Sequence, residues 1–349
     1  MQISWNLNVL YVILGGACEL NCLYCKDSLK DPTPIPINPA IYDYIENRRF
    51  EQDKNFQICF YGGEPLEYID QIKAITSELK GRRINGNFSL ITNGKLITQE
   101  LVDYFNENNF YVQVSWDGPN SIETRGYDVM QDKKDLLLKI NNICFNTVLS
   151  NKNYPLDFIN GVDEFIKQRD LENKDLQWVR IHCNLIHDYN CNTGLADEID
   201  YDKWQSQMKQ VIALRDVQVS KKQRSAARYF VTTLINPFMR INKSKSSRCC
   251  GQAQFILNLA VDGRFFLCHN IDKEIGTIED EPVDLLRNAA KFDNATEIFK
   301  ETGCYDCKYF KGCKNCLSVS DKSRKEYYCK LVEATLEPIM PLIDTEEEK

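Results

Sequence analysis

The sequence predicts an α/β fold in which parallel βα units form a partial (β/α)6 barrel, followed by a cysteine-rich domain. Over the first two hundred residues, short apolar runs alternate with longer amphipathic ones. Strands that alternate with helices at this spacing form a parallel sheet of right-handed βα units. Eight of the 15 cysteines lie between Cys249 and Cys329. Clustered cysteines in a chain without an export signal indicate metal binding rather than disulfides.

Six apolar runs define the expected strands of the barrel. The helical patterns between them include residues 156–169, where apolar residues such as Phe158, Val162 and Phe165 recur at helical spacing. In a barrel of this kind, chemistry gathers where the strands end and the following loops begin. The expected strands are residues 8–14, 56–61, 87–92, 111–115, 143–149 and 178–185, and two further expected helices are residues 66–79 and 99–108.

The domain organisation follows from the change in composition along the chain. We expect the barrel to occupy residues 1–210 and a helical linker to occupy residues 211–248, which end in a Lys/Ser-rich stretch. The cysteine-rich domain is expected at residues 249–336, and residues 337–349 form an acidic C-terminal tail.

Charge and hydropathy exclude several classes of partner. The 349 residues carry a formal net charge of −7, which argues against nucleic acid or an anionic membrane as a partner. The apolar run at residues 5–14 lacks the basic start and cleavage site of a signal peptide, and it is too short to span a bilayer. The protein is therefore predicted to be cytoplasmic.

Three cysteines lie in the loop that follows the first expected strand, in the pattern Cys18-x3-Cys22-x2-Cys25. Iron–sulfur clusters are usually held by four cysteine thiolates, so three leave one iron open to a substrate. A structural zinc site would need a fourth ligand nearby, and no histidine precedes His182. The loop is otherwise polar, which disfavours three buried structural thiols.

This cysteine spacing, with the aromatic Tyr24 before the third cysteine, resembles the radical S-adenosylmethionine (SAM) superfamily. The resemblance implies a [4Fe–4S] cluster whose open iron binds the amino and carboxylate groups of SAM. It implies cleavage of SAM to methionine and a 5′-deoxyadenosyl radical, which abstracts hydrogen from a substrate. The protein would be an oxidoreductase that holds this radical close to one C–H bond and excludes water.

Further segments at the expected strand ends resemble motifs of the same superfamily. Gly62-Gly63-Glu64-Pro65 follows the second strand, and it resembles the motif that binds the methionyl ammonium of SAM. Ser115 is the expected contact to the SAM carboxylate, and Arg125 is a candidate for pairing with the same group. Without the cysteine loop, these segments would be interpreted as ordinary turns. The residues assigned to SAM by the resemblance are Tyr24, Gly62, Gly63, Glu64, Pro65, Thr92, Asn93, Ser115, Asp117 and Arg125.

The C-terminal cysteines form a second metal-binding pattern. Two Cys-x2-Cys pairs, beginning at Cys304 and Cys313, are separated by only five residues, which is short for a zinc ribbon. A zinc site is the alternative to iron–sulfur clusters here. The eight cysteines suffice for two four-thiolate sites. They are Cys249, Cys250, Cys268, Cys304, Cys307, Cys313, Cys316 and Cys329.

This segment resembles the SPASM domain, an extension of some radical SAM enzymes that binds two auxiliary [4Fe–4S] clusters. The resemblance implies one cluster on Cys304, Cys307, Cys313 and Cys329. It implies a second on Cys268, Cys316 and one or both of Cys249 and Cys250. The chain departs from the pattern in the adjacent Cys249-Cys250 and in the two-residue gap before Cys316. These departures leave the full ligation of the second cluster open.

The resemblance implies a peptide or protein substrate. We expect maturation of a small ribosomally made precursor peptide by cross-linking, with a reductase supplying electrons. Leader recognition would use the barrel, the C-terminal domain or a separate protein, since nothing before the first strand has room for a leader-binding domain.

The alternative enzyme is an anaerobic sulfatase-maturating enzyme, which forms formylglycine. That family usually has an aspartate after the Gly-x4-Cys cysteine, whereas this chain has His269. His269 is a candidate proton acceptor, with a structural role as the alternative. A non-catalytic iron–sulfur or zinc protein is the alternative of another class. The bond formed, the catalytic base and the oligomeric state do not follow from the sequence.

Overall fold

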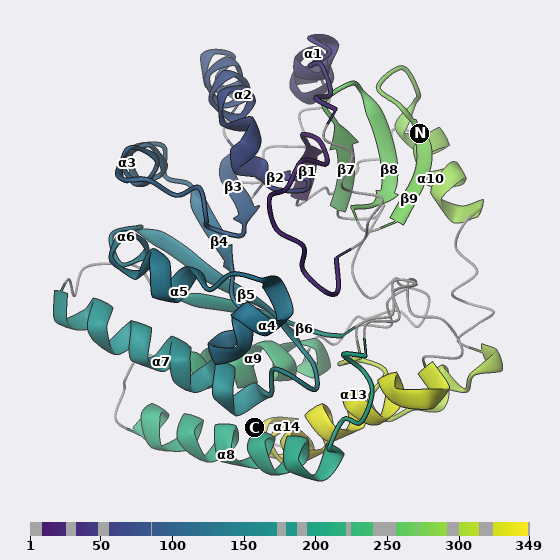
Figure 1. Cartoon of the computed structure of the whole chain (residues 1–349). Helices are drawn as coiled ribbons and strands as arrows, with labels where there is room; N and C mark the ends of the chain where they lie inside the picture. Colours follow the sequence, from purple (N-terminus) through teal and green to yellow (C-terminus); the bar gives the residue numbers. More distant parts are fainter. Residues whose placement is uncertain are drawn as a thin grey trace. The chain divides into compact units, whose positions relative to one another are not determined.

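A computed structural model of the chain (Figure 1) describes eleven segments and divides them into two compact units. The first unit draws on Met1–Glu19, Lys26–Gln113 and Gly251–Asn294, and the second on Leu20–Cys25, Val114–Cys250 and Ala295–Lys349. The predicted ligands Cys249, Cys250 and Cys316 lie outside the described residues. Those residues are 9–25, 33–47, 56–84, 86–172, 179–186, 194–220, 225–239, 256–269, 271–291, 300–313 and 324–347.

The first unit is built on a mixed sheet with strand order β3-β2-β1-β7-β8-β9. Strand β1 pairs in parallel with β2 on one side, where Val9 lies opposite Gln57, and with β7 on the other, where Val9 lies opposite Ile256. Strands β8 and β9 then extend this edge as antiparallel neighbours. The strands are β1 Val9–Ile13, β2 Gln57–Tyr61, β3 Asn87–Thr92, β7 Ile256–Ala260, β8 Arg264–Cys268 and β9 Ile271–Thr277.

Amphipathic helices cover this sheet because alternate strand residues offer them an apolar face. Leu10, Val12 and Ile58 are completely buried, and Phe60 stacks on Phe88 and Phe110. Helix α3 starts at a cap in which Thr98 Oγ1 accepts a hydrogen bond from the backbone N–H of Leu101. The helices of the unit are α1 Ala40–Asn47, η2 Pro65–Tyr68, α2 Ile69–Gly81, α3 Gln99–Glu107 and α10 Pro282–Lys291.

The second unit contains the parallel pair β5 Asn142–Leu149 and β6 Arg180–Leu185. Strand β4 Tyr111–Ser115 crosses the division between the units, and within the second unit the N–H of Trp116 donates to the carbonyl of Asn146. The helices that follow β4 are η3 Gly118–Asn120, α4 Ser121–Arg125, α5 Val129–Asp132, α6 Lys134–Leu137 and α7 Pro155–Glu172. Those later in the chain are α8 Tyr201–Ser220, α9 Ala226–Met239, η4 Cys304–Asp306, η5 Arg324–Tyr328, α13 Cys329–Leu336, η6 Glu337–Ile339 and α14 Met340–Glu347.

The core of the second unit joins helices that lie far apart in the sequence. Trp204 on α8 is completely buried, and its indole N–H donates to Thr335 Oγ1 on α13 at 3.0 Å. The buried carboxylate of Asp163 on α7 accepts hydrogen bonds from the N–H of Ala226 and from Gln218. The C-terminal helix α13 is therefore part of this core.

The predicted fold class is confirmed: the chain is an α/β protein with parallel βα units, consistent with a partial barrel. Each predicted strand is present, with ends shifted by at most two residues, because short apolar runs mark the buried strands of a parallel sheet well. The predicted helix at residues 156–169 is the core of α7. Within the described residues, no helix combines the length and apolar character needed to cross a membrane. The domain boundaries given above stay predictions.

Candidate active site

The loops after β1 and β2 pack backbone against backbone in the first unit. The N–H of Gly63 donates to the carbonyl of Gly15 at 2.9 Å, and that of Glu64 donates to Ala17 at 2.7 Å. A Cβ atom on Gly63 would lie 2.3 Å from the carbonyl oxygen of Ala17. Only glycine permits this approach, since real Cβ atoms do not come so close to backbone. The hydroxyl of Tyr68 accepts a hydrogen bond from the N–H of Ala17, which fixes the residue before Cys18.

Glu64 is a buried carboxylate at the centre of this site. Its Oε1 accepts hydrogen bonds from the N–H of Leu66 at 3.0 Å and from Thr92 Oγ1 at 2.6 Å, and its Oε2 accepts from the N–H of Asn93 at 2.8 Å. Burial nevertheless raises the pKa of Glu64 to about 7. An ionised carboxylate has about four acceptor positions, so these three donors leave room for one more.

Asn93 connects the end of β3 to the cysteine loop. Its Nδ2 lies 3.9 Å from Cys18 Sγ and donates to Glu19 Oε1 at 3.1 Å, while its Oδ1 accepts from the N–H of Lys95. The structure therefore brings together Glu64, Thr92, Asn93 and Cys18, as expected of neighbouring strand ends in a parallel sheet.

The three cysteines of the loop are half-buried, reduced thiols. Cys18 belongs to the first unit, whereas Cys22 and Cys25 belong to the second, where the N–H of Cys25 donates to the carbonyl of Cys22 in a turn. In the part of the chain that the structure describes, no three Cys, His, Asp or Glu side chains are gathered as a metal-ion site. The soft thiolates and the loop spacing are the features that fit an iron–sulfur cluster.

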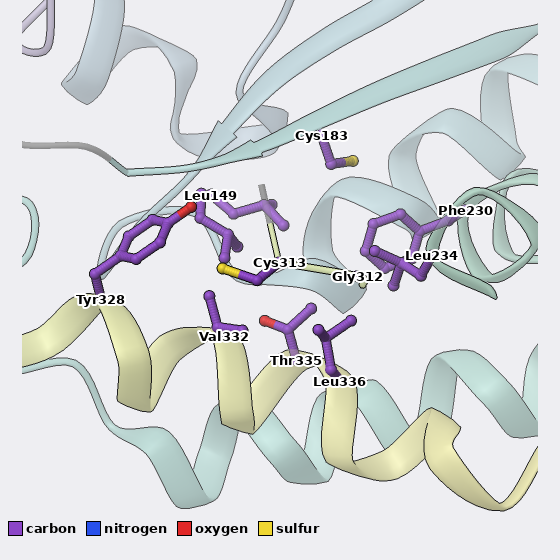
Figure 2. A pocket seen from close by; sticks show the side chains of 11 residues that line it. Leu149, Cys183, Phe230, Leu234, Gly312, Cys313, Tyr328, Val332, Thr335 and Leu336 are labelled. Atoms are coloured by element: carbon purple, nitrogen blue, oxygen red, sulfur yellow. The ribbon is translucent and has the colours of Figure 1, made fainter. Parts of the chain in front are cut away.

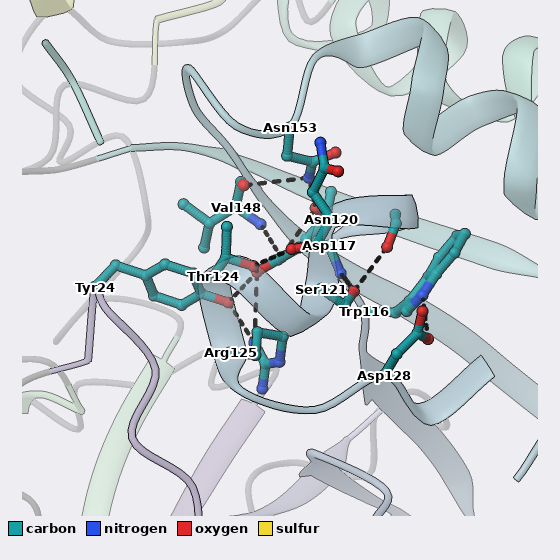
Figure 3. Close-up of polar contacts among 12 residues, drawn as sticks. Tyr24, Trp116, Asp117, Asn120, Ser121, Thr124, Arg125, Asp128, Val148 and Asn153 are labelled. Carbon is teal, nitrogen blue, oxygen red and sulfur yellow. Dashed lines mark hydrogen bonds and ion pairs between the residues drawn. The ribbon is translucent and has the colours of Figure 1, made fainter. Parts of the chain in front are cut away.

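In the second unit, Asp117 is the centre of a buried polar network at the end of β4 (Figure 3). Its Oδ2 accepts hydrogen bonds from Tyr24 Oη at 2.6 Å and Thr124 Oγ1 at 2.8 Å. Its Oδ1 accepts from Thr147 Oγ1 at 3.2 Å and from the N–H of Val148 at 3.1 Å. This one carboxylate thus joins the cysteine loop, α4 and β5.

Arg125 completes the network. Its guanidinium donates to Tyr24 Oη and lies 4.0 Å from Asp117 Oδ2. Burial alone would lower the pKa of Arg125, but Tyr24, Cys22 and Asp117 raise it, so the guanidinium stays charged. Burial raises the pKa of Tyr24 well above its ordinary value, and the phenol stays neutral as a donor.

The remaining predicted SAM contacts lie next to these groups along the chain. Ser115 is half-buried at the end of β4, and Pro65 is buried as the first residue of η2. Their predicted roles stay predictions.

His269 lies beside two tyrosines at the end of β8 in the first unit. Its ring centroid is 4.6 Å from that of Tyr11 and 4.7 Å from that of Tyr61. Burial lowers the pKa of His269 to about 4, so the imidazole is neutral at pH 7. Its neighbour Cys268 is the last residue of β8.

The described C-terminal cysteines are reduced thiols distributed over both units. Cys268 lies in the first unit, and the others lie in the second. There the N–H of Cys307 donates to the carbonyl of Cys304, and that of Cys313 donates to Tyr309. Cys307 and Cys329 are exposed, and the latter begins α13.

An apolar pocket lies next to Cys313 in the second unit (Figure 2). Cys183 on β6 lines it together with apolar side chains from α9 and α13. Its walls carry no charged side chain, so it differs in kind from the Glu64 and Asp117 sites. Its lining residues are Leu149, Cys183, Leu185, Phe230, Leu234, Gly312, Cys313, Tyr328, Val332, Thr335 and Leu336.

Several residues of the site were missed by sequence reasoning. Tyr68 holds Ala17 from 51 positions away, and Thr124 holds Asp117. A hydroxyl residue within an ordinary helix or strand carries no sequence signal of such a role. Only the GGEP motif near Tyr68 and the DGP turn at Asp117 marked the neighbourhoods in which to look.

The chain is similar to known proteins in sequence and in fold. The sequence model of the Radical SAM superfamily matches residues 12–143. A cysteine-type anaerobic sulfatase-maturating enzyme of Clostridium perfringens is 24% identical over 96% of each chain. The radical SAM cyclopropyl synthase TigE of Paramaledivibacter caminithermalis is 22% identical over 90% of this chain and 69% of the relative.

Two solved structures share the fold. The anaerobic sulfatase-maturating enzyme anSMEcpe with bound AdoMet has a TM-score of 0.67 at 20% identity, covering 98% of this chain and 99% of that one. SuiB of Streptococcus suis, bound to precursor peptide SuiA, has a TM-score of 0.59 at 15% identity, covering 90% and 72%. Enzymes of the matching superfamily use SAM and a [4Fe–4S] cluster, and the Glu64 site and cysteine loop fit these two groups. Residues 12–143 therefore carry a radical SAM domain, and the chain is an enzyme with this domain.

Proposed function

We propose that this enzyme modifies a peptide, cross-linking side chains of a small ribosomally synthesised precursor. When bound, the cluster and SAM supply a 5′-deoxyadenosyl radical that abstracts hydrogen from the substrate. The observation that carries the SAM part of the proposal is Glu64. It is a buried carboxylate whose pKa is raised to about 7 and which has one acceptor position left for a cation.

The roles of the chain's own residues follow from this geometry. Glu64 would receive the methionyl ammonium of SAM, because a buried carboxylate is most stable beside a cation. The glycine backbone of Gly62 and Gly63 would let the ligand approach closely. Asn93 would hold Cys18 and Glu64 in a fixed relation through its contacts to both. Ser115 remains the proposed contact to the SAM carboxylate.

We further propose two auxiliary [4Fe–4S] clusters on the C-terminal cysteines. The described members of this set, which form no disulfide, are Cys268, Cys304, Cys307, Cys313 and Cys329. The Cys18/Cys22/Cys25→Ala variant, reconstituted without oxygen, should keep about eight irons. Bound zinc in place of iron would contradict the auxiliary clusters and leave the first cluster untouched.

The choice of reaction depends on the residue after Cys268. A sulfatase-maturating enzyme would be expected to carry an aspartate there, whereas this chain has a neutral His269 between Tyr11 and Tyr61. This difference favours cross-linking. His269 is a candidate proton acceptor in that reaction, and a reductase and a leader-binding protein are candidate partners.

A second candidate function is sulfatase maturation. It is favoured by the relative from Clostridium perfringens, whose similarity spans 96% of both chains. In that reaction a cysteine side chain loses two hydrogens, and water then supplies an aldehyde oxygen while the sulfur leaves as hydrogen sulfide. The product differs in mass from a cross-linked peptide, so the two functions can be separated.

The test is the intact mass of peptide products made with the anaerobic, reconstituted enzyme. A precursor peptide encoded beside the gene should lose about two hydrogens, and the Cys18/Cys22/Cys25→Ala variant should leave it unchanged. A cysteine-containing sulfatase peptide that gains an aldehyde, while the precursor stays unchanged, would favour the second candidate. An enzyme that makes no 5′-deoxyadenosine from SAM under reducing conditions would contradict both functions.

A further inference from the structure

We propose that Tyr24, Asp117 and Arg125 form a clamp that holds the cysteine loop and places a fixed positive charge beside Cys22, the middle ligand of the proposed cluster. The inference rests on the proposed cluster at Cys18, Cys22 and Cys25. It concerns only the second unit, in which all four residues lie. It makes Arg125 a positioning residue for the cluster loop.

The clamp has a mechanical part. Tyr24 lies between the second and third cysteines of the loop, and its hydroxyl donates to Asp117 Oδ2 at 2.6 Å. The N–H of Leu23 donates to the carbonyl of Thr124 at 2.9 Å, which is a second anchor one residue away. Consecutive residues of the loop are thus tied to α4 and the end of β4, as Figure 3 shows for Tyr24.

Asp117 is a rigid support for the hydroxyl of Tyr24. Its carboxylate is completely buried and is fixed from the other side by Thr147 Oγ1 and the N–H of Val148. Asn153 Nδ2 in turn donates to Thr147 Oγ1 at 2.6 Å. A buried carboxylate whose two oxygens both accept hydrogen bonds is held firmly in place. The hydroxyl of Tyr24 therefore has one well-defined position.

The clamp also has an electrostatic part. The Arg125 guanidinium donates to Tyr24 Oη, lies 5.8 Å from the Tyr24 ring centroid and is about nine-tenths buried. Cys22 directly precedes Leu23 and Tyr24, which are hydrogen-bonded to Thr124 and Arg125 respectively, so the guanidinium lies next to this part of the loop. A buried cation beside a cluster thiolate favours the more negative, reduced cluster, since net charge and the sulfur surroundings set cluster potentials.

This role differs from a contact between Arg125 and the SAM carboxylate, and the two can be separated without substrate. If Arg125 belongs to the clamp, replacing it changes the potential of the cluster even when SAM is absent. If Arg125 only contacts SAM, replacing it changes only the affinity for SAM. The first measurement is therefore an anaerobic redox titration of the reconstituted full-length protein without SAM. The redox transition that is absent from the Cys18/Cys22/Cys25→Ala variant belongs to the cluster proposed at these three cysteines.

Arg125→Met should move the potential of this cluster to more negative values. Arg125→Lys, which keeps the charge, should restore most of the wild-type value. Lys152→Met is the matched control, because it removes the same charge outside the clamp. Lys152 is half-exposed and pairs with Glu123 on α4 at 2.8 Å. This variant should leave the potential unchanged. An unchanged potential in a folded Arg125→Met protein, with only weaker SAM binding, would overturn the electrostatic part.

Tyr24→Phe tests the anchor and removes a single hydroxyl, so it keeps the proposal testable if Arg125→Met does not fold. Removing a support of this kind typically costs 10–100-fold in metal affinity, so a chelator should extract iron from this cluster about tenfold faster or more. Extraction at the wild-type rate would overturn the anchor. A wild-type cluster whose electron paramagnetic resonance spectrum does not respond to SAM would instead contradict the proposed function. The iron-release rate of Tyr24→Phe would still decide the clamp.

Discussion

Two buried carboxylates, Glu64 in the first unit and Asp117 in the second, differ in whether a cation is paired with them. Both accept hydrogen bonds from threonine hydroxyls and backbone N–H groups. Asp117 has Arg125 at 4.0 Å, whereas Glu64 has no cation paired with it among the described residues. We therefore expect Glu64 to bind a cation and Asp117 to support the structure around it.

The largest effect is expected from removing the charge of Asp117. Asp117→Asn leaves the Arg125 cation buried without its partner, and breaking a buried pair in this way costs about 3–5 kcal/mol of unfolding free energy. Glu123→Gln is the control, because its pair with Lys152 is half-exposed and contributes about 0–1 kcal/mol. Denaturant unfolding of both variants measures the difference, and equal losses would show that Asp117 is no more a support than a surface residue.

Glu64 should make the stability of the cofactor-free protein depend on pH. Because burial raises its folded-state pKa to about 7, its contribution is complete below pH 4.5 and is lost as the pH rises to about 7. The loss is about 3 kcal/mol, from roughly 1.4 kcal/mol per pKa unit. Unfolding free energies of wild type and Glu64→Gln, measured from pH 4.5 to 8, should converge at low pH and differ most above pH 7. Parallel curves would contradict the raised pKa.

SAM binding should depend on the same carboxylate. Glu64→Gln should bind SAM about 100-fold more weakly, since truncating one partner of a buried charge pair costs about 2–5 kcal/mol. Wild-type affinity should also fall as the pH drops below about 7, where Glu64 becomes protonated. Calorimetric titration measures both effects, with Glu67→Gln on the exposed side of η2 as the control. An affinity unchanged in Glu64→Gln would remove the distinction between the two carboxylates.

The smallest effect tests how the Glu64 loop is held. Gly63→Ala places a Cβ atom 2.3 Å from the carbonyl oxygen of Ala17, so the loops must separate at a cost of about 1–3 kcal/mol. Gly81→Ala at the end of α2 meets no atom within 4 Å and should be neutral or stabilising by up to about 1 kcal/mol. Thermal unfolding of the two variants compares them, and a neutral Gly63→Ala would show that the loops separate freely.

Much of the fold was predictable because its signals are local. The strand at residues 111–115 was predicted with its observed ends, and α3 differs from its predicted range by a single residue. The pairing of β7 with β1 was not predicted, since about 240 residues separate the two strands and an apolar run does not specify its neighbour. The cysteine-rich region was predicted as a separate C-terminal domain, a boundary that stays a prediction.

By itself, the sequence predicted the chemistry of the site. The spacing of Cys18, Cys22 and Cys25 and the motif from Gly62 to Pro65 are contiguous stretches, so no knowledge of the fold is needed to read them. The tertiary structure alone decided which residues support that chemistry. Asp117 meets Tyr24 across 93 positions, and His269 lies between Tyr11 and Tyr61. Such contacts arise from packing between elements distant in the chain. Burial, which residue type alone does not reveal, strengthens the hydrogen bonds of these polar side chains.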